Sequence, residues 1–149
     1  MTAPRTATFL ILGTPPSPNR LLGKHWRAVR GRDGAAGEWH DRAAIAVAFA
    51  RSRGTWDGLP FARATVRYRV WLDSRRRRDL DGIVASMKWC LDALVPAVLP
   101  DDSWTVVPAL TAEVAGVDRR QPRVEVVVEA LSQEQRASAR TVGSKGGGT

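Results

Sequence analysis

Four aspartates flank one predicted helix in the middle of this sequence and carry its most distinctive chemistry. Asp79 and Asp81 come directly before that helix, and Asp101 and Asp102 follow it. Two carboxylates at alternate positions of an extended chain point to the same side, where they repel each other unless a cation lies between them. Mg²⁺ prefers such oxygen ligands, completed by water and substrate phosphate. The spacing therefore predicts a metal site built from Asp79, Asp81, Asp101 and Asp102.

Each pair of aspartates also has a simpler interpretation. Asp81 would serve as the N-cap of the helix if its carboxylate accepted a backbone N–H from the first turn. A cap, however, accounts for one aspartate and leaves Asp79 unexplained. Asp101 and Asp102, taken alone, are typical of a turn.

Lys88 lies seven residues after Asp81, which is two turns along the same face of the predicted helix. Its side chain leans toward the N-terminus of the helix and therefore toward the carboxylates. There the ammonium group would hold the scissile phosphate or stabilise the charge that develops during phosphoryl transfer. The alternative is a surface ion pair with Asp92 at the i, i+4 spacing, worth about 0.2–0.5 kcal/mol.

Basic residues surround the aspartates in three segments. Residues 75–78 are an unbroken run of arginines, and the predicted strand over residues 63–72 places arginines on one face. A proline-rich loop over residues 13–20 leads into a third basic segment around Trp26, where cations and an aromatic ring could grip a nucleic-acid backbone. The alternatives are a solvated strand face and a stiff surface connection. The predicted DNA-binding residues are Asn19, Arg20, Lys24, Arg27, Arg67, Arg69, Arg75, Arg76, Arg77 and Arg78.

The composition favours a globular protein that binds polyanions. The 149 residues carry a net charge of +8 with an isoelectric point near 11.1, so nucleic acid is the leading partner and an anionic membrane surface the second. The single cysteine, Cys90, excludes an intrachain disulfide and a thiolate zinc site, and its helical position predicts a buried thiol. No signal peptide or apolar run of membrane-spanning length is visible, which predicts a soluble protein of the cytoplasm without a membrane partner.

Hydrophobic periodicity predicts strands over residues 6–12, 63–72, 104–114 and 123–131, and helices over residues 35–53 and 82–95. This order, β-α-β-α-β-β, predicts an α/β (α+β) fold: one domain over residues 1–131 with a mixed four-stranded sheet and two main helices. Residues 132–149 are rich in Ser, Gln, Arg and Gly, and predict a disordered basic tail.

The ordered set of motifs resembles the RusA family of Holliday junction resolvases, common in phages and prophages. The resemblance covers most of residues 9–131. It rests on Pro-Pro-Ser-Pro-Asn at 15–19, on Asp-Leu-Asp at 79–81 after the arginine run, on Lys88 followed by Leu-Asp-Ala-Leu at 91–94, and on Asp-Asp-Ser at 101–103. Two departures concern Gly82, where the family usually has Asn, and the spacing from Asp81 to Lys88, which is commonly four residues and here is seven.

The resemblance implies a homodimeric crossover junction endodeoxyribonuclease that depends on Mg²⁺, with Mn²⁺ as a substitute, and needs no organic cofactor. Such an enzyme nicks opposing strands of four-way DNA junctions during recombination and repair. The family's metal-binding acids match Asp79, Asp81 and Asp102, with Asp101 beside them, and its catalytic lysine matches Lys88.

Three other functions stay open for the sequence. The first is a nuclease of the same fold with a looser preference for flaps or forks, and the second is a non-catalytic DNA-binding accessory protein with structural carboxylates. Gly82 and the displaced lysine favour that second possibility. RNA is the third possible substrate, because nothing in the sequence selects against a 2′-hydroxyl.

Overall fold

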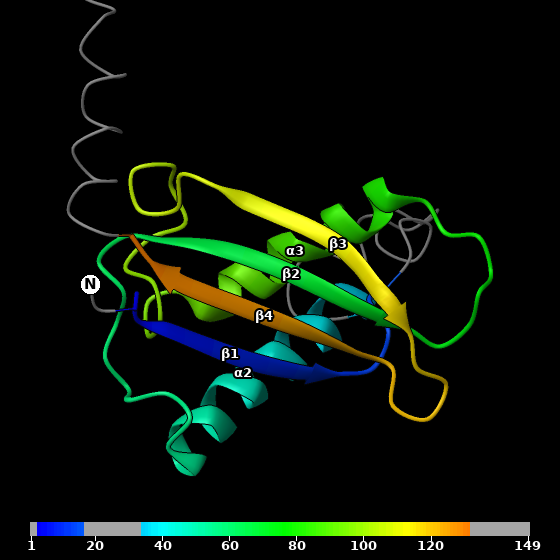
Figure 1. The fold of residues 1–149 in the computed structure, drawn as a ribbon, viewed down its shortest axis with the longest axis horizontal. Helices are drawn as coiled ribbons and strands as arrows, with labels where there is room; N and C mark the ends of the chain where they lie inside the picture. The colour runs from blue at the N-terminus through cyan, green and yellow to red at the C-terminus, as the bar shows by residue number, and fades with distance from the viewer. Residues whose placement is uncertain (1–2, 17–33, 132–149) are drawn as a thin grey trace, which may run out of the picture.

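Four β-strands form one mixed sheet in the computed structural model, which describes residues 3–16 and 34–131 of the chain (Figure 1). The strands are β1 (Thr6–Leu12), β2 (Ala64–Leu72), β3 (Leu110–Val117) and β4 (Arg123–Ala130). Their spatial order is β1-β4-β2-β3. Strand β4 pairs antiparallel with β1 and β2, whereas β2 and β3 run parallel. Strands β1 and β3 therefore form the two edges of the sheet.

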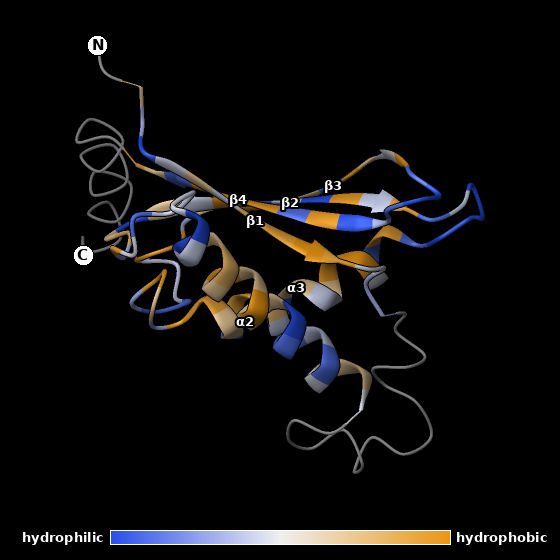
Figure 2. Ribbon diagram, turned by 90° about the horizontal axis from the view of Figure 1, so that it is seen from below, coloured by the Kyte–Doolittle hydropathy of each residue, from blue (hydrophilic) through white to orange (hydrophobic). Residues whose placement is uncertain are grey.

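Two helices, α2 (Ala35–Arg53) and α3 (Leu80–Leu94), lie on the same face of the sheet, and no described element covers the other face (Figure 2). Helix α3 lies on the crossover between β2 and β3, as parallel strands require. The predicted α+β fold, with a mixed four-stranded sheet, two helices and the order β-α-β-α-β-β, is confirmed.

The core lies between the sheet and the two helices. Alternate residues of the strands are buried there, and the largest include Phe9, Val66, Tyr68 and Val126, each at most 2 % exposed. Cys90 of α3 is also buried, as predicted, and burial raises the pKa of its thiol to about 12. The thiol is therefore protonated at neutral pH and is a packing group.

Two predicted boundaries are wrong. Strand β3 spans Leu110–Val117 rather than residues 104–114, because the chain before it turns: the N–H groups of Val106 and Val107 both donate to the carbonyl of Ser103. Helix α3 starts at Leu80, two residues earlier than predicted. Among the described residues, neither helix is long and apolar enough to cross a membrane.

A buried chain of hydrogen bonds joins both helices to the centre of the sheet. The indole N–H of Trp39 on α2 donates to the Tyr68 hydroxyl over 2.9 Å, and that hydroxyl lies 3.0 Å from the Ser86 hydroxyl of α3. Ser86 in turn donates to the carbonyl of Ile83 over 2.6 Å. Burial raises the pKa of Tyr68, so the phenol is neutral and available as both donor and acceptor.

Tyr68→Phe is expected to lower the free energy of unfolding by about 1–3 kcal/mol, because the buried Trp39 N–H loses its acceptor. Urea denaturation followed by circular dichroism measures this loss. Thr65→Val is the matched control: it removes a hydroxyl from the uncovered face of the same strand and should change stability by less than about 0.5 kcal/mol. Equal stability of Tyr68→Phe and the native protein would contradict the importance of this bond.

Candidate active site

The first two predicted metal ligands lie where α3 begins. Asp79 is the residue directly before the helix, with extended backbone angles, and its side chain makes no capping hydrogen bond. Asp81 lies in the first turn, where its Oδ1 accepts the N–H of Gly82 over 2.9 Å. Asp81 is therefore not the N-cap. The unpaired N–H groups at this end of a helix favour negative charge, so they stabilise both carboxylates.

The expected reason for grouping these two carboxylates does not hold. The prediction assumed an extended chain through Asp79 and Asp81, with both side chains on one side. Because the helix already begins at Leu80, Asp81 has a helical conformation, and positions two apart in a helix do not face each other. Asp81 instead shares a face with Val84 and Lys88.

A pocket of about 270 Å³ between α3 and β3 brings two other predicted site residues together. It is lined by Val84, Met87, Lys88, Leu91, Asp102, Leu110 and Ala112. Lys88 and Asp102 thus lie at one pocket although they come from different elements. Asp81 lies one turn before Val84 on the same face of the helix. Among the described residues, Lys88 forms no ion pair with Asp92, so its ammonium group is free of the alternative predicted for it.

The apolar walls of this pocket were not predicted. Val84 has the periodicity of a core residue, yet it is about half exposed, as is Leu110 on β3. Strand β3 is at the edge of the sheet, where α3 only partly covers it. Sequence periodicity identifies the apolar face of a helix, but it carries no signal for how much of that face a neighbouring strand covers.

The loop that carries Asp101 and Asp102 is fastened at both ends. Val98 and Leu99 before it are fully buried, and the carbonyl of Val98 accepts the N–H of Phe61 over 2.8 Å. After it, the carbonyl of Val106 accepts the N–H of Ala64 over 2.9 Å. These anchors hold the intervening residues beside the α3–β3 pocket.

The two adjacent aspartates have different environments. The carboxylate of Asp101 accepts the N–H of Asp102 over 2.8 Å, and a hydrogen bond from the Ser103 side chain, with smaller help from Asp102, lowers the pKa of Asp101. Asp101 therefore has the local contacts of a turn residue, the alternative interpretation of this pair. Asp102 is the member that lines the pocket.

The described residues contain no ready-made metal centre. Within residues 3–16 and 34–131, no three side chains of His, Cys, Asp or Glu come together as a group that could hold a metal ion. The four predicted ligands are thus separated into the pair at the start of α3 and the pair in the loop. Their donor chemistry nevertheless suits Mg²⁺, which commonly takes one or two carboxylates and completes its shell with water and phosphate.

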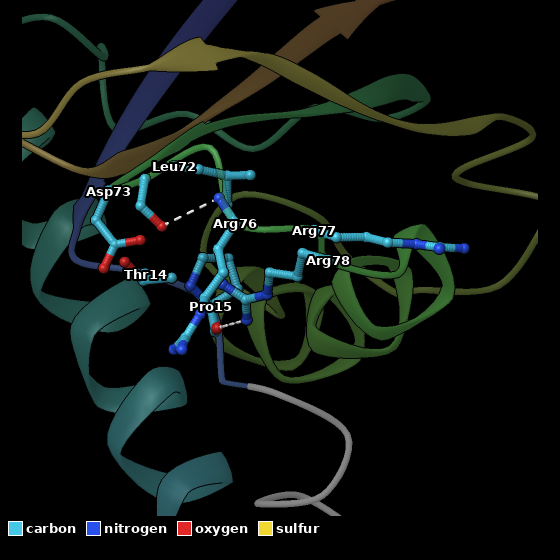
Figure 3. Close-up of a pocket in the computed structure, with 8 residues that line it drawn as sticks. Thr14, Pro15, Leu72, Asp73, Arg76, Arg77 and Arg78 are labelled. Carbon is cyan, nitrogen blue, oxygen red and sulfur yellow. Dashed lines mark hydrogen bonds between the residues drawn. The ribbon is translucent and has the colours of Figure 1, made fainter.

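A second pocket, of about 470 Å³, lies beside the arginine run (Figure 3). It is lined by Thr14, Pro15, Leu72, Asp73, Ser74, Arg76, Arg77 and Arg78. Figure 3 shows Arg76 and Arg78 turned toward Thr14 and Pro15, whereas Arg77 extends away from them. Concentrated guanidinium groups at a concave surface suit a phosphate group.

Arg78 connects the arginine run to the end of the first loop. Its guanidinium donates to the carbonyl of Pro15, and partial burial lowers its pKa while the nearby Asp73 opposes that shift. Arg78 is therefore partly a structural residue, and nothing in a run of four arginines indicates which one turns inward. The predicted DNA-binding residues that follow Pro15 lie outside the described residues: Asn19, Arg20, Lys24 and Arg27.

The uncovered face of the sheet is not the uniformly cationic surface that the strand pattern suggested. Arg69 forms ion pairs with Glu113 at 2.9 Å and with Glu125 at 3.3 Å. Arg123 is held in the same way by Asp118 and Glu125, and its guanidinium lies 4.7 Å from the Trp71 ring centre. Arg67 is exposed on the same face. Acidic partners from β3 and β4, which the β2 sequence does not reveal, offset the charge of Arg69 but not that of Arg67.

The relationship of this chain to known families adds no further constraint. No protein-family model matches the chain, and none of the curated proteins compared with it matches either.

Proposed function

We propose that this protein is a Mg²⁺-dependent endonuclease that resolves four-way DNA junctions by paired nicks. The observation that carries the proposal is the pocket shared by Lys88 and Asp102, on the helix that Asp79 and Asp81 begin. Acidic oxygens and one ammonium group are what hydrolysis of a phosphodiester requires, since the acids hold a cation and the ammonium offsets phosphate charge. The site of action would be the cytoplasm of a bacterial or phage-infected cell.

Each residue has a separate role in the proposed reaction. Asp79, Asp81 and Asp102 would hold the cation together with a phosphate oxygen of the DNA, so that the substrate itself completes the site. Lys88 would donate to the scissile phosphate and stabilise its developing charge. A bound Mg²⁺ supplies Lewis-acid stabilisation of the leaving oxygen and activates water. Carboxylates that are apart without substrate are compatible with this mechanism, because catalytic contacts often tighten only in the complex.

The proposed substrate also implies a two-fold partner. A four-way junction offers two equivalent strands for cleavage, and a homodimer with two-fold symmetry presents two equivalent sites. The arginine-lined pocket would grip the DNA backbone near each site.

A non-catalytic DNA-binding protein is the second candidate. It is favoured by the absence of a three-carboxylate group among the described residues. Calorimetric titration with Mg²⁺ separates the two: metal uptake that is lost in Asp81→Ala supports the nuclease, whereas DNA binding indifferent to divalent metal supports the accessory protein.

The direct test is incubation of a labelled synthetic four-way junction with and without Mg²⁺ or Mn²⁺. The nuclease should produce nicked duplexes only when the metal is present, and linear duplex of the same sequence should remain intact. Cleavage of flaps and forks at equal rates would restrict the proposal to a branched-DNA nuclease. A protein inert on every branched DNA with either metal would contradict it.

Arg76→Ala combined with Arg77→Ala is expected to weaken DNA binding and to flatten its dependence on salt. Each lost phosphate contact should reduce the slope of log K against log salt by about 0.9. Fluorescence anisotropy at several salt concentrations measures both quantities. Arg69→Ala is the matched control, because Glu113 and Glu125 already neutralise that guanidinium. An equal loss of slope in the control would show that the arginine run has no special contact with DNA.

A further inference from the structure

An apolar groove lies at the opposite edge of the sheet from the candidate active site. Strand β1 and helix α2 form it, with a volume of about 220 Å³, and it is lined by Leu10, Leu12, Arg42, Ile45, Ala46 and Phe49. Ile45 and Phe49 are large apolar side chains, 67 % and 55 % exposed. Such grouped exposure marks an interaction surface more often than single exposed residues do.

The free side of β1 adds unpaired backbone groups to this groove. In the antiparallel pairing with β4, Gly13 donates to the Pro122 carbonyl, so alternate residues before it exchange hydrogen bonds with β4. The backbone groups of Thr8, Leu10 and Leu12 consequently point outward, and the Leu12 carbonyl accepts a hydrogen bond from Arg42. Within the described residues, no strand covers this edge. An uncovered edge strand is a ready template for association.

The exposed side of α2 has a charge pattern that matches a second copy of the same helix in antiparallel orientation. Glu38, Arg42, Ile45, Phe49 and Arg53 follow each other at spacings of three and four, so they form one stripe along the helix. The helix carries Glu38 in its first turn and Arg51 and Arg53 in its last turn, and Arg42 between them forms an ion pair with Glu38 at 3.0 Å. An identical helix in antiparallel orientation therefore meets opposite charge at both ends, with Ile45 near the centre and Phe49 opposite Arg42 of the partner subunit.

From this pattern we infer that the groove formed by β1 and α2 binds a second copy of this chain through a two-fold axis close to Ile45. Ile45 lies about halfway along α2 between Glu38 and Arg53. Two antiparallel α2 helices that cross at Ile45 therefore place Glu38 of one subunit opposite Arg53 of the partner subunit. A two-fold interface uses each contact twice. The apolar residues of the groove would then cover the same residues of the partner.

This choice of partner rests on the proposed function in one respect: a junction resolvase needs both of its sites open to DNA. Because β1 and β3 are opposite edges of the sheet, a dimer joined through β1 and α2 leaves the Lys88 and Asp102 pockets uncovered. A dimer joined through β3 would cover them. The charge pattern of α2 is independent of that function.

Sedimentation velocity of the full chain in the low micromolar range is the first test, and it requires no nuclease activity. The native protein should be a dimer, and Ile45→Glu should raise the dimer Kd at least about a hundredfold, because the two new carboxylates would be buried close together at the two-fold axis without partners. Val114→Glu, at an exposed apolar position on β3, is the matched control and should remain a dimer. A monomeric native protein, or a dimer broken by Val114→Glu and not by Ile45→Glu, would overturn the inference.

A charge exchange tests the orientation with surface changes that preserve the fold. Glu38→Arg alone and Arg53→Glu alone should each raise the dimer Kd by about tenfold, because each creates two repulsive contacts. The double variant should restore the native Kd. Single variants without effect, or a double variant weaker than either single one, would overturn the antiparallel arrangement, and the cleavage assay on the same proteins reports separately on the nuclease.

Discussion

Asp102→Asn is expected to reduce the rate of junction cleavage by about a thousandfold or more while junction affinity changes by less than about threefold. The amide keeps the shape of the side chain but removes the negative charge that would hold the cation at the pocket shared with Lys88. Single-turnover cleavage at saturating protein measures the rate, and gel shift in Ca²⁺ measures affinity. Asp79→Asn should behave in the same way.

The neighbouring aspartate supplies a stringent control. Asp101 is engaged by Asp102 and Ser103 within a turn, so Asp101→Asn should lower the cleavage rate by less than about tenfold. Loss of cleavage in Asp101→Asn with normal rates in Asp102→Asn would show that Asp101, and not Asp102, is the metal ligand. Normal rates in both, together with normal rates in Asp79→Asn, would reject the proposed metal site altogether.

Lys88→Ala is expected to slow cleavage by about a hundredfold, the typical effect of removing one donor to the charge of a transition state. Lys88→Arg keeps the charge and should recover part of the rate. Single-turnover cleavage again provides the measurement, with thermal unfolding as a check on the fold. Asp92→Asn is the control for the alternative surface ion pair. If it slowed cleavage as much as Lys88→Ala, the lysine would act through Asp92.

The architecture was predictable because its signals are local. Strict alternation in β2 and β4 and the three-and-four spacing in α3 identify buried faces directly, and the order of elements requires a crossover helix. Strand β3 was misplaced because Ser103 and the residues after it form a turn, although their side chains favour a strand. That outcome depends on anchors to residues 61 and 64, which are distant in sequence.

Only the residue types of the candidate site could be predicted from the sequence. The sequence identified carboxylates, a lysine and arginines as candidates, but it did not indicate which of them line the site and which are engaged by other parts of the fold. Asp81 enters the helix because α3 begins at Leu80, Arg69 is neutralised by glutamates of two other strands, and Arg78 turns inward to Pro15. Each of these outcomes depends on a partner that lies elsewhere in the chain.

The buried Ser86–Tyr68 contact has a consequence for how the site adapts to DNA. Ser86 lies between Asp81 and Lys88 on α3, so its hydrogen bond to the centre of the sheet opposes sliding or rotation of this part of the helix. The backbone positions of Asp81 and Lys88 therefore keep a constant separation, and only their side chains adjust. Adjustment to the width of a branch point is therefore left to the few residues between the anchors at Val98 and Val106, where Asp102 lies in a segment without regular secondary structure.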